Sequence, residues 1–103
     1  MVARSRQKVV EFIRTCVERA EQGDDTTLEI TKHFRQRMQQ RGLFWGDIKT
    51  VLLGPEKVEL QGTDDQGRQQ VWVFGKIRNI GNMRIVCSIQ WDTRLITLNW
   101  EQP

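Results

Sequence analysis

The residues best suited to chemistry lie in one segment, Thr31-Lys-His-Phe-Arg-Gln-Arg-Met-Gln-Gln-Arg-Gly42. With about 100° between successive helical residues, His33, Arg37 and Arg41 lie within a sector of about 80°. An imidazole can act as general acid or base, and guanidinium groups bind phosphate through paired N–H donors. The stripe therefore suggests chemistry on a phosphate. A histidine with a purely structural role is the alternative.

The same segment must also bury an apolar side. Phe34 and Met38 occupy the sector next to the stripe, and we expect them to face the core. The stripe then borders the buried side, while the outer surface is left to Arg35 and three glutamines.

Positive charge is concentrated in two parts of the chain. Residues 31–49 contain five basic side chains against Asp47, and residues 66–94 contain five against Asp92, which gives each segment a net charge of +4. Arginine dominates both segments, and its planar fork suits phosphate better than lysine does. A polyanion such as RNA is one partner that this charge allows, and an ordinary solvated basic surface is the other interpretation.

A chain of 103 residues, 38% hydrophobic and 28% charged, suits one domain over residues 1–103. No apolar run approaches the roughly 20 residues that span a bilayer. No apolar stretch follows the basic start at residues 1–6, so no secretory signal is predicted, and we expect a cytoplasmic protein without a membrane partner. Cys16 and Cys87 are predicted to be buried free thiols. One histidine and no CxxC pair predict neither a metal site nor a cofactor.

Apolar residues recur at three- and four-residue steps in three segments, which predicts helices over residues 5–21, 32–41 and 45–53. Ser5 and Thr31 are the expected N-caps of the first two helices. Gly42 closes the second helix, and Gly54-Pro55 stops the third. Residues 27–31 alternate and could form a short strand.

After Pro55 the apolar period changes from helical to alternating. Strands are predicted over residues 57–61, 70–77, 84–91 and 94–100, with turns around residues 62–68, 79–82 and 92–93. Four strands at short, regular spacing predict an antiparallel meander. The predicted fold class is α+β, with N-terminal helices packed on one face of a four-stranded antiparallel sheet.

The two faces of this predicted sheet differ in character. In strand 84–91, the isoleucines and Cys87 share one face, and Arg84, Val86, Ser88 and Gln90 share the other. The apolar face should carry the helices. The mixed face is where we expect a ligand, with an ordinary solvated face as the alternative. In the last strand, one side is expected to hold Ile96, Leu98 and Trp100, and the other Leu95, Thr97 and Asn99.

The segment Thr31–Gly42, followed by Leu-Phe-Trp-Gly-Asp-Ile and a short helix ending in Gly-Pro-Glu, resembles the family of the domain of unknown function 4258. The signature of that family is T-x-H-(A/F)-x-x-R-M-x-x-R-G. Phe34 stands where alanine is more usual in that signature. The likeness covers roughly residues 28–100, so the helix at 5–21 lies outside it. The residues at the expected spacing are His33, Arg37, Met38, Arg41 and Gly42.

The resemblance implies the fold of the barnase-like, EndoU-like, colicin-type and RelE-like ribonucleases. Many of these cleave RNA without a metal, often as toxins of toxin–antitoxin pairs, so a cognate antitoxin or immunity protein would be a second partner. His33 would be the catalytic acid or base, and Arg37 and Arg41 would hold the scissile phosphate. Arg84 and Thr97 would complete the site from the sheet. The reaction would be attack of a ribose 2′-hydroxyl on the adjacent phosphate.

Only one histidine is present, so Glu29 or an arginine would have to supply the second proton-transfer group. Two functions without catalysis stay open. One is a module that binds RNA or ribosomes through the basic helix and the mixed sheet face. The other is a protein-interaction domain that uses the N-terminal helix and exposed tryptophans. The four tryptophans are expected mainly in or beside the core, although one or two could stack on bases.

Overall fold

The computed structural model of the protein describes residues 5–78 and 80–101. Residues 1–4 lie outside these ranges, and the expected absence of a secretory signal rests partly on them. Asn79, part of a predicted turn, also lies outside. The described residues form three helices, α1 (Arg6–Glu21), α2 (Lys32–Gln40) and α3 (Trp45–Leu53), close to the predicted bounds. In the described part of the chain, no helix combines the length and the apolar character needed to cross a bilayer.

The helix starts follow the local chemistry that the sequence predicts. The Ser5 side chain accepts a hydrogen bond from the Lys8 N–H, and the Thr31 side chain accepts one from the Phe34 N–H. Gly42 follows α2 with a φ of +65°, a conformation that glycine adopts without strain. Both N-caps and the glycine that closes α2 are therefore confirmed.

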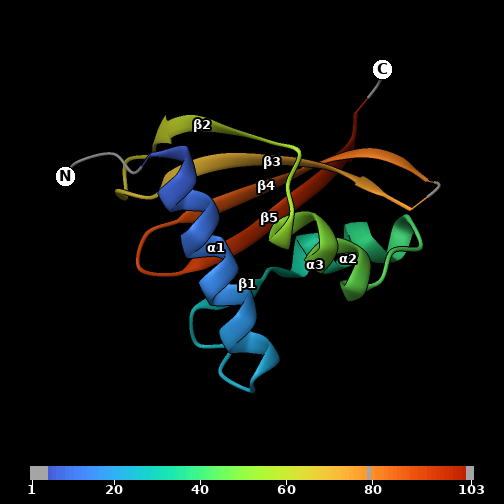
Figure 1. Ribbon diagram of the computed structural model, residues 1–103, viewed down its shortest axis with the longest axis horizontal. Helices are drawn as coiled ribbons and strands as arrows, with labels where there is room; N and C mark the ends of the chain where they lie inside the picture. Colours follow the sequence, from blue (N-terminus) through green and yellow to red (C-terminus); the bar gives the residue numbers. More distant parts are fainter. Residues whose placement is uncertain (1–4, 79, 102–103) are drawn as a thin grey trace.

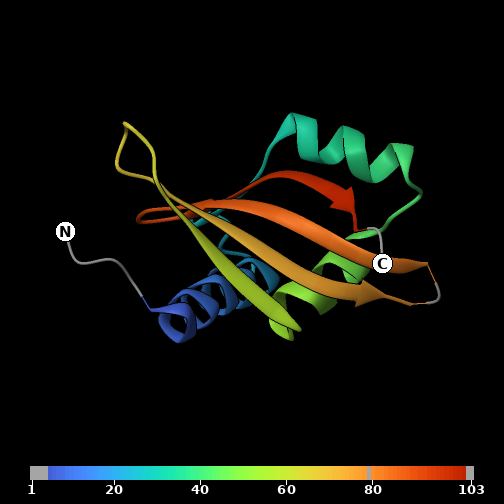
Figure 2. The same ribbon diagram turned by 90° about the horizontal axis from the view of Figure 1, so that it is seen from above.

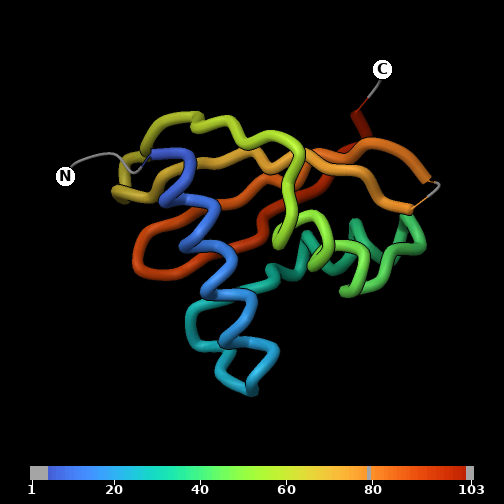
Figure 3. Tube along the Cα trace, viewed as in Figure 1, coloured from blue at the N-terminus to red at the C-terminus, as the bar shows by residue number. Residues whose placement is uncertain are grey.

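The strands of the described residues form one five-stranded sheet in the order β1-β5-β4-β3-β2. The antiparallel meander is confirmed and follows the chain through β2 to β5, as Figure 3 shows. The strands of the sheet are β1 (Leu28–Ile30), β2 (Lys57–Thr63), β3 (Gln69–Ile77), β4 (Gly81–Ile89) and β5 (Thr93–Trp100).

The prediction of four strands, all antiparallel, is wrong because β1 adds to the sheet in parallel with β5. Leu28 pairs with Thr93 and Ile30 with Leu95. Alternation over a few residues indicates a short strand, but it does not tell which distant strand will pair with it. That choice depends on the free edge of β5, which becomes available only when the meander has formed.

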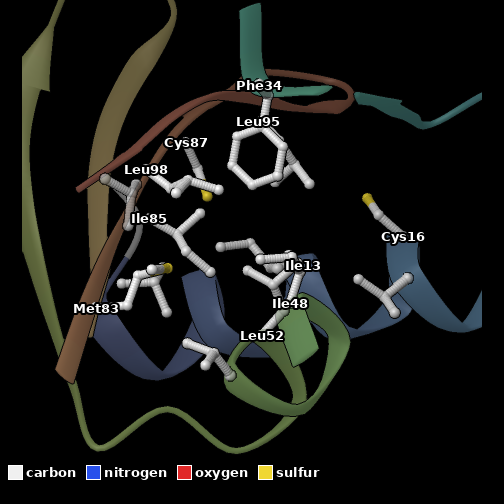
Figure 4. Close-up of a cluster of buried hydrophobic side chains, with 14 of the residues drawn as sticks. Ile13, Cys16, Phe34, Ile48, Leu52, Met83, Ile85, Cys87, Leu95 and Leu98 are labelled. Carbon is white, nitrogen blue, oxygen red and sulfur yellow. The ribbon is translucent and has the colours of Figure 1, made fainter. Parts of the chain in front are cut away.

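The core lies between the sheet and helices α1 and α3, which cross the same face of the sheet in Figure 1. Phe34 enters this core from α2 and lies beside Leu95 (Figure 4). Cys16 and Cys87 are both buried and free, as predicted. The close-up shows side chains of α1, α3 and the sheet meeting in one layer, among them Ile13, Ile48, Leu52, Met83, Ile85 and Leu98.

A β-bulge in β5 changes the predicted alternation of that strand. Cys87 pairs with Leu95 and Val86 with Thr97, so Ile96 is an extra residue without a partner across the ladder. Leu95 and Leu98 consequently both face the core and are fully buried. The expectation that Leu95 shares a side with Thr97 and Asn99 is wrong, because strict alternation assumes an unbroken ladder.

The predicted strand 84–91 also ends earlier than expected. β4 stops at Ile89, and Trp91 lies in the turn to β5 with 63% of its surface exposed. The expectation of a core or core-edge position is therefore wrong for this tryptophan.

We predict that Gly75→Ala destabilises the fold by about 1 to 3 kcal/mol, because overpacking a tight core forces shifts. A Cβ at this position would lie 2.8 Å from Val51 Cγ1 on α3. Gly46→Ala is the matched control: its Cβ would meet no atom within 4 Å, and alanine favours the helix. Urea unfolding should show opposite signs for the two substitutions. Equal effects would contradict the close approach of α3 to β3.

A second prediction concerns the buried thiol of Cys87. Burial raises the pKa of this group to about 12, so it stays protonated and unreactive in the folded protein at pH 9. In the unfolded chain the thiol has a pKa of about 8.5. Because only the unfolded chain loses this proton between that pH and 12, the contribution of Cys87 to the free energy of unfolding falls over this range. Ellman's reagent should therefore react with Cys87 only as fast as the protein unfolds, and rapid reaction at pH 8 would contradict this burial.

Candidate functional site

The sheet face that does not carry α1 and α3, here called the open face, presents two rows of side chains across the strands. Ladder pairing defines both rows, and each row runs from β2 at one edge of the sheet through β3 and β4 to β5. The first row is Glu59, Trp72, Val86 and Thr97. The second row is Lys57, Phe74, Arg84 and Asn99.

Helix α2 lies alongside β5, separated from α1 and α3, in the view of Figure 2. Thr31 fixes the start of this helix on the strand: its hydroxyl donates to the Leu95 carbonyl at 2.7 Å, and its backbone N–H donates to the same oxygen. Phe34, one residue past His33 and 0% exposed, turns one side of α2 into the core. The neighbouring side of α2 must then meet the open face.

His33 reaches the end of the first row. Its Nε2 lies 3.1 Å from the Thr97 hydroxyl, and the ring stays exposed to solvent. An exposed imidazole held by one hydrogen bond can still approach a ligand, which a ring sealed in the core could not do. The structure thus brings together His33 and Thr97, as the sequence predicted.

Arg37 reaches the end of the second row, one helical turn after His33. Its Nη2 donates to the Asn99 Oδ1 at 3.0 Å and lies 3.4 Å from the Leu98 carbonyl, beyond the stretch of β5 that pairs with β1. Its Nε has no hydrogen-bond partner in the described structure although it is buried. Arg37 therefore holds α2 against β5 while part of its donor capacity stays unused.

Arg84 lies opposite Asn99 in the second row, and Arg37 donates to the Asn99 side chain from the helix. The Arg84 guanidinium lies 4.4 Å from the centre of the Trp72 ring, and its Nε lies 3.3 Å from Glu101. The structure thus places Arg84 on the open face, one strand away from the residues that His33 and Arg37 contact.

Arg41, the fifth predicted residue, does not reach the two rows by any contact in the described structure. It is the C-cap residue of α2, and its guanidinium lies 5.6 Å from the ring centre of Trp100. Burial lowers the pKa of Arg41, and the positive charge of nearby Arg37 lowers it further. A periodic helix would have continued the stripe, but α2 ends at Gln40, and Arg41 turns toward the end of β5.

Ion pairs neutralise most of the basic segment 66–94. Arg68 forms a buried pair with Asp92 at 2.8 Å, and three more arginines pair with carboxylates on other elements. These pairs are Arg78–Asp47, Arg84–Glu101 and Arg94–Glu29. In α2, by contrast, the described residues include no carboxylate that pairs with Arg37 or Arg41. The uncompensated positive charge beside the open face therefore comes mainly from the helix.

Glu29, a candidate for the second proton-transfer group, faces β5 rather than His33 by its described contact. Its carboxylate lies 3.2 Å from Arg94 Nε, and the register places the two residues opposite each other. Its charge is thus engaged by a structural arginine.

Sequence reasoning missed four members of the two rows: Lys57, Glu59, Trp72 and Phe74. The ring centres of Trp72 and Phe74 are 6.5 Å apart in an edge-to-face arrangement, and the Lys57 ammonium lies 5.0 Å from the Phe74 ring centre. The signal was present, because residues 72 and 74 alternate with the buried Val71 and Val73. Asn99 was assigned to the mixed face but not to the site.

Two cavities lie on the other side of α2, away from the rows. One of about 390 Å³ is lined by Met38, Leu43 and Phe44, and another of about 320 Å³ by Leu28, Ile30 and Trp45. Arg35 borders both. Within residues 5–78 and 80–101, no group of three His, Cys, Asp or Glu side chains is arranged to hold a metal ion.

Comparison with known proteins adds one finding. The family model described as "Domain of unknown function (DUF4258)" matches residues 30–99, which include β1 in part, α2, α3 and nearly all of the meander. No curated protein matches the chain.

We predict that Thr31→Ala lowers the free energy of unfolding by about 1 to 3 kcal/mol, because it removes a helix cap and a part-buried hydrogen bond to Leu95. Thr31→Ser keeps the hydroxyl and should retain most of the stability. Hydrogen exchange at the Phe34 amide should accelerate in the alanine variant alone. Unchanged exchange there would show that the cap does not fix α2 on β5.

Proposed function

The chain belongs to the family of the domain of unknown function DUF4258, and we propose that it is a metal-independent endoribonuclease of the toxin type. The observation that carries this proposal is the placement of His33 and Arg37 at the β5 end of the two rows, with Arg84 on the neighbouring strand β4. Adjacent rows are separated by two residues along a strand, about 7 Å. One phosphate at this end of the sheet is thus within reach of the imidazole and of both guanidinium groups.

The phosphate would lie over Asn99, between Arg37 and Arg84. Arg37 donates to the Asn99 side chain, Arg84 is the ladder partner of Asn99 on β4, and guanidinium groups bind phosphate oxygens through paired N–H donors. Among the described residues no carboxylate pairs with Arg37, so its guanidinium is available to a phosphate, whereas Arg84 would exchange its surface pair with Glu101 for the phosphate.

His33 acts in the proposed reaction as the general base. It takes the proton of a ribose 2′-hydroxyl, and the 2′-oxygen forms a bond to the adjacent phosphorus. The bond between phosphorus and the 5′-oxygen of the next nucleotide breaks, and that oxygen takes a proton from water. The products are a 2′,3′-cyclic phosphate and a 5′-hydroxyl. Arg37 and Arg84 stabilise the negative charge that develops on the phosphate oxygens.

Thr97 and Asn99 act as positioning residues in this reaction. Thr97 holds the imidazole through Nε2, and Asn99 holds Arg37. Glu29 is paired with Arg94, so we assign no carboxylate of the described residues as the acid for the leaving oxygen. A slow enzyme is the consequence.

We infer in addition that the fold is related to that of the RelE-like and barnase-like ribonucleases. The four-stranded meander with α1 and α3 on one face supports this relationship. β1 and the docking of α2 on β5 would then be additions at one edge. A cognate antitoxin or immunity protein is the protein partner that a toxin of this kind requires.

The single imidazole also supports a second candidate function, a module that binds RNA or ribosomes without cleaving it. The same arginines would hold the phosphates, and His33 would only contribute a hydrogen bond. Binding through phosphate contacts weakens steeply with salt.

We predict that the purified protein cleaves RNA in EDTA, and that His33→Ala lowers the rate by about 10² to 10⁴-fold, the usual contribution of a general base. Arg37→Ala should lower it by about 10² to 10³-fold through the loss of charge stabilisation. Cleavage of a labelled RNA, with detection of the cyclic phosphate end, measures both effects.

Arg35→Ala is the matched control, because it removes the same charge from the same helix. The Arg35 guanidinium contacts the Ile30 carbonyl and borders the cavities on the other side of α2. Its cleavage rate should stay near that of the wild type. Cleavage that survives His33→Ala and Arg37→Ala unchanged would remove this site from the mechanism, and salt-dependent binding without cleavage would favour the non-catalytic module.

A further inference from the structure

We propose that Trp72 and Phe74 form a base-stacking subsite, and that the ligand of the open face is single-stranded RNA. This inference rests on the proposed function for the identity of the phosphate site, and it adds the substrate class and the residues that select it. The two aromatic residues occupy the β3 positions of the same two rows that end at His33 and Arg37.

The aromatic side chains lie where the fold does not need them. Core positions of β3 alternate with them: Val71 and Val73 are buried, and Gly75 lies directly under Val51 of α3. Trp72 and Phe74 point to the opposite face and remain half-buried. Large aromatic groups on the face that no helix of the core layer covers offer flat apolar surface to a ligand.

Cations flank these rings on both sides. The Arg84 guanidinium lies over Trp72 at 4.4 Å, and the Lys57 ammonium lies near Phe74 at 5.0 Å. Each cation also pairs with a carboxylate, Arg84 with Glu101 and Lys57 with Glu59, but pairs at the surface contribute little and exchange readily. A base can stack on an aromatic ring or on a guanidinium plane, while the cations attract its phosphates.

The distance along the rows suits one stretch of nucleotide chain. β3 and β5 are separated by two strand spacings, about 10 Å, so a base stacked over β3 and a phosphate held beside β5 can belong to neighbouring nucleotides. The direction from Trp72 through Val86 to Thr97 thus leads from a base to the 2′-hydroxyl that His33 would deprotonate.

A flat stacking surface selects for unpaired bases. In an RNA duplex the bases stack on each other and expose only their edges in the grooves, so their flat faces cannot reach Trp72. In a single strand the bases can turn outward and stack on side chains. The charged helix alone would bind both forms, so discrimination between them reports on the aromatic pair.

The test uses a short 2′-O-methyl RNA, which cannot be cleaved because the 2′-oxygen is blocked. Binding of the wild-type protein to the labelled single strand is compared by fluorescence anisotropy with binding to the same sequence in a duplex. We expect the single strand to bind at least about tenfold more tightly. Trp72→Leu should weaken single-strand binding by about 5- to 150-fold, the factor that corresponds to stacking one base on an aromatic ring, and should leave duplex binding nearly unchanged.

Two further variants keep this test specific. Trp72→Phe keeps an aromatic ring and should retain most of the affinity, while Trp91→Leu removes an exposed tryptophan from the β4–β5 turn and should change nothing. Circular dichroism shows whether Trp72→Leu folds. If it does not, the test is the quenching of tryptophan fluorescence when the single strand binds. This quenching should be strong in the wild type and largely lost in Trp72→Phe.

Equal affinity for single strand and duplex, absence of binding to either, or full affinity in Trp72→Leu would overturn the stacking subsite. The proposed catalysis fails separately. If the protein shows the expected binding pattern but does not cleave RNA, the proposed ribonuclease activity is wrong and the stacking subsite stands. If it cleaves RNA and Trp72→Leu does not change the cleavage, the stacking subsite is wrong and the ribonuclease activity stands.

Discussion

The free edge of β5 is the constraint on which the candidate site depends. β1 covers this edge only from Thr93 to Leu95, and the backbone groups beyond it need other partners. Helix α2 and its N-cap supply two of them, through the Thr31 hydroxyl at the Ile96 carbonyl and through Arg37 at the Leu98 carbonyl. Because Phe34 is buried, the helical period directs the side chains of His33 and Arg37 to the margin of the open face. Arg37, which donates a hydrogen bond to the backbone of β5, is thus also part of the candidate site.

The β-bulge at Ile96 is the second condition. Without this extra residue, a core position for Leu98 would put Thr97 and Leu95 on the same side and would leave a hydrophobic residue facing α2. The bulge lets Leu95 and Leu98 both enter the core while Thr97 and Asn99 face outward. The same irregularity therefore completes the core and aligns the two rows with His33 and Arg37. Bulges often occur where a strand must redirect a side chain toward a site.

Charge in this protein divides into a compensated and an uncompensated part. The arginines of the sheet are held by Asp92, Glu101, Glu29 and Asp47, and one of these pairs is buried. A buried pair of this kind is costly to break, because removal of one partner leaves the other charge without compensation. The excess of +4 that the sequence places in residues 66–94 is thus largely used within the fold. The arginines of α2, together with Arg84 once its surface pair with Glu101 exchanges, carry the charge that remains available to a ligand.

The sequence by itself determined the elements of this protein and most of the candidate site. Local signals such as the Ser5 and Thr31 caps, the Gly42 stop and the change of period after Pro55 act within a few residues, so they could be interpreted directly. The helical stripe of His33 and Arg37 was identified in this way, and the resemblance to the matched family added Arg84 and Thr97. Only the tertiary structure decided the parallel position of β1, the bulge at Ile96, the turn of Arg41 toward Trp100 and the alignment of Trp72 and Phe74 with the helix. These features depend on contacts between residues far apart in the chain, and a local pattern of side chains does not encode which distant edge, ring or strand will be the partner.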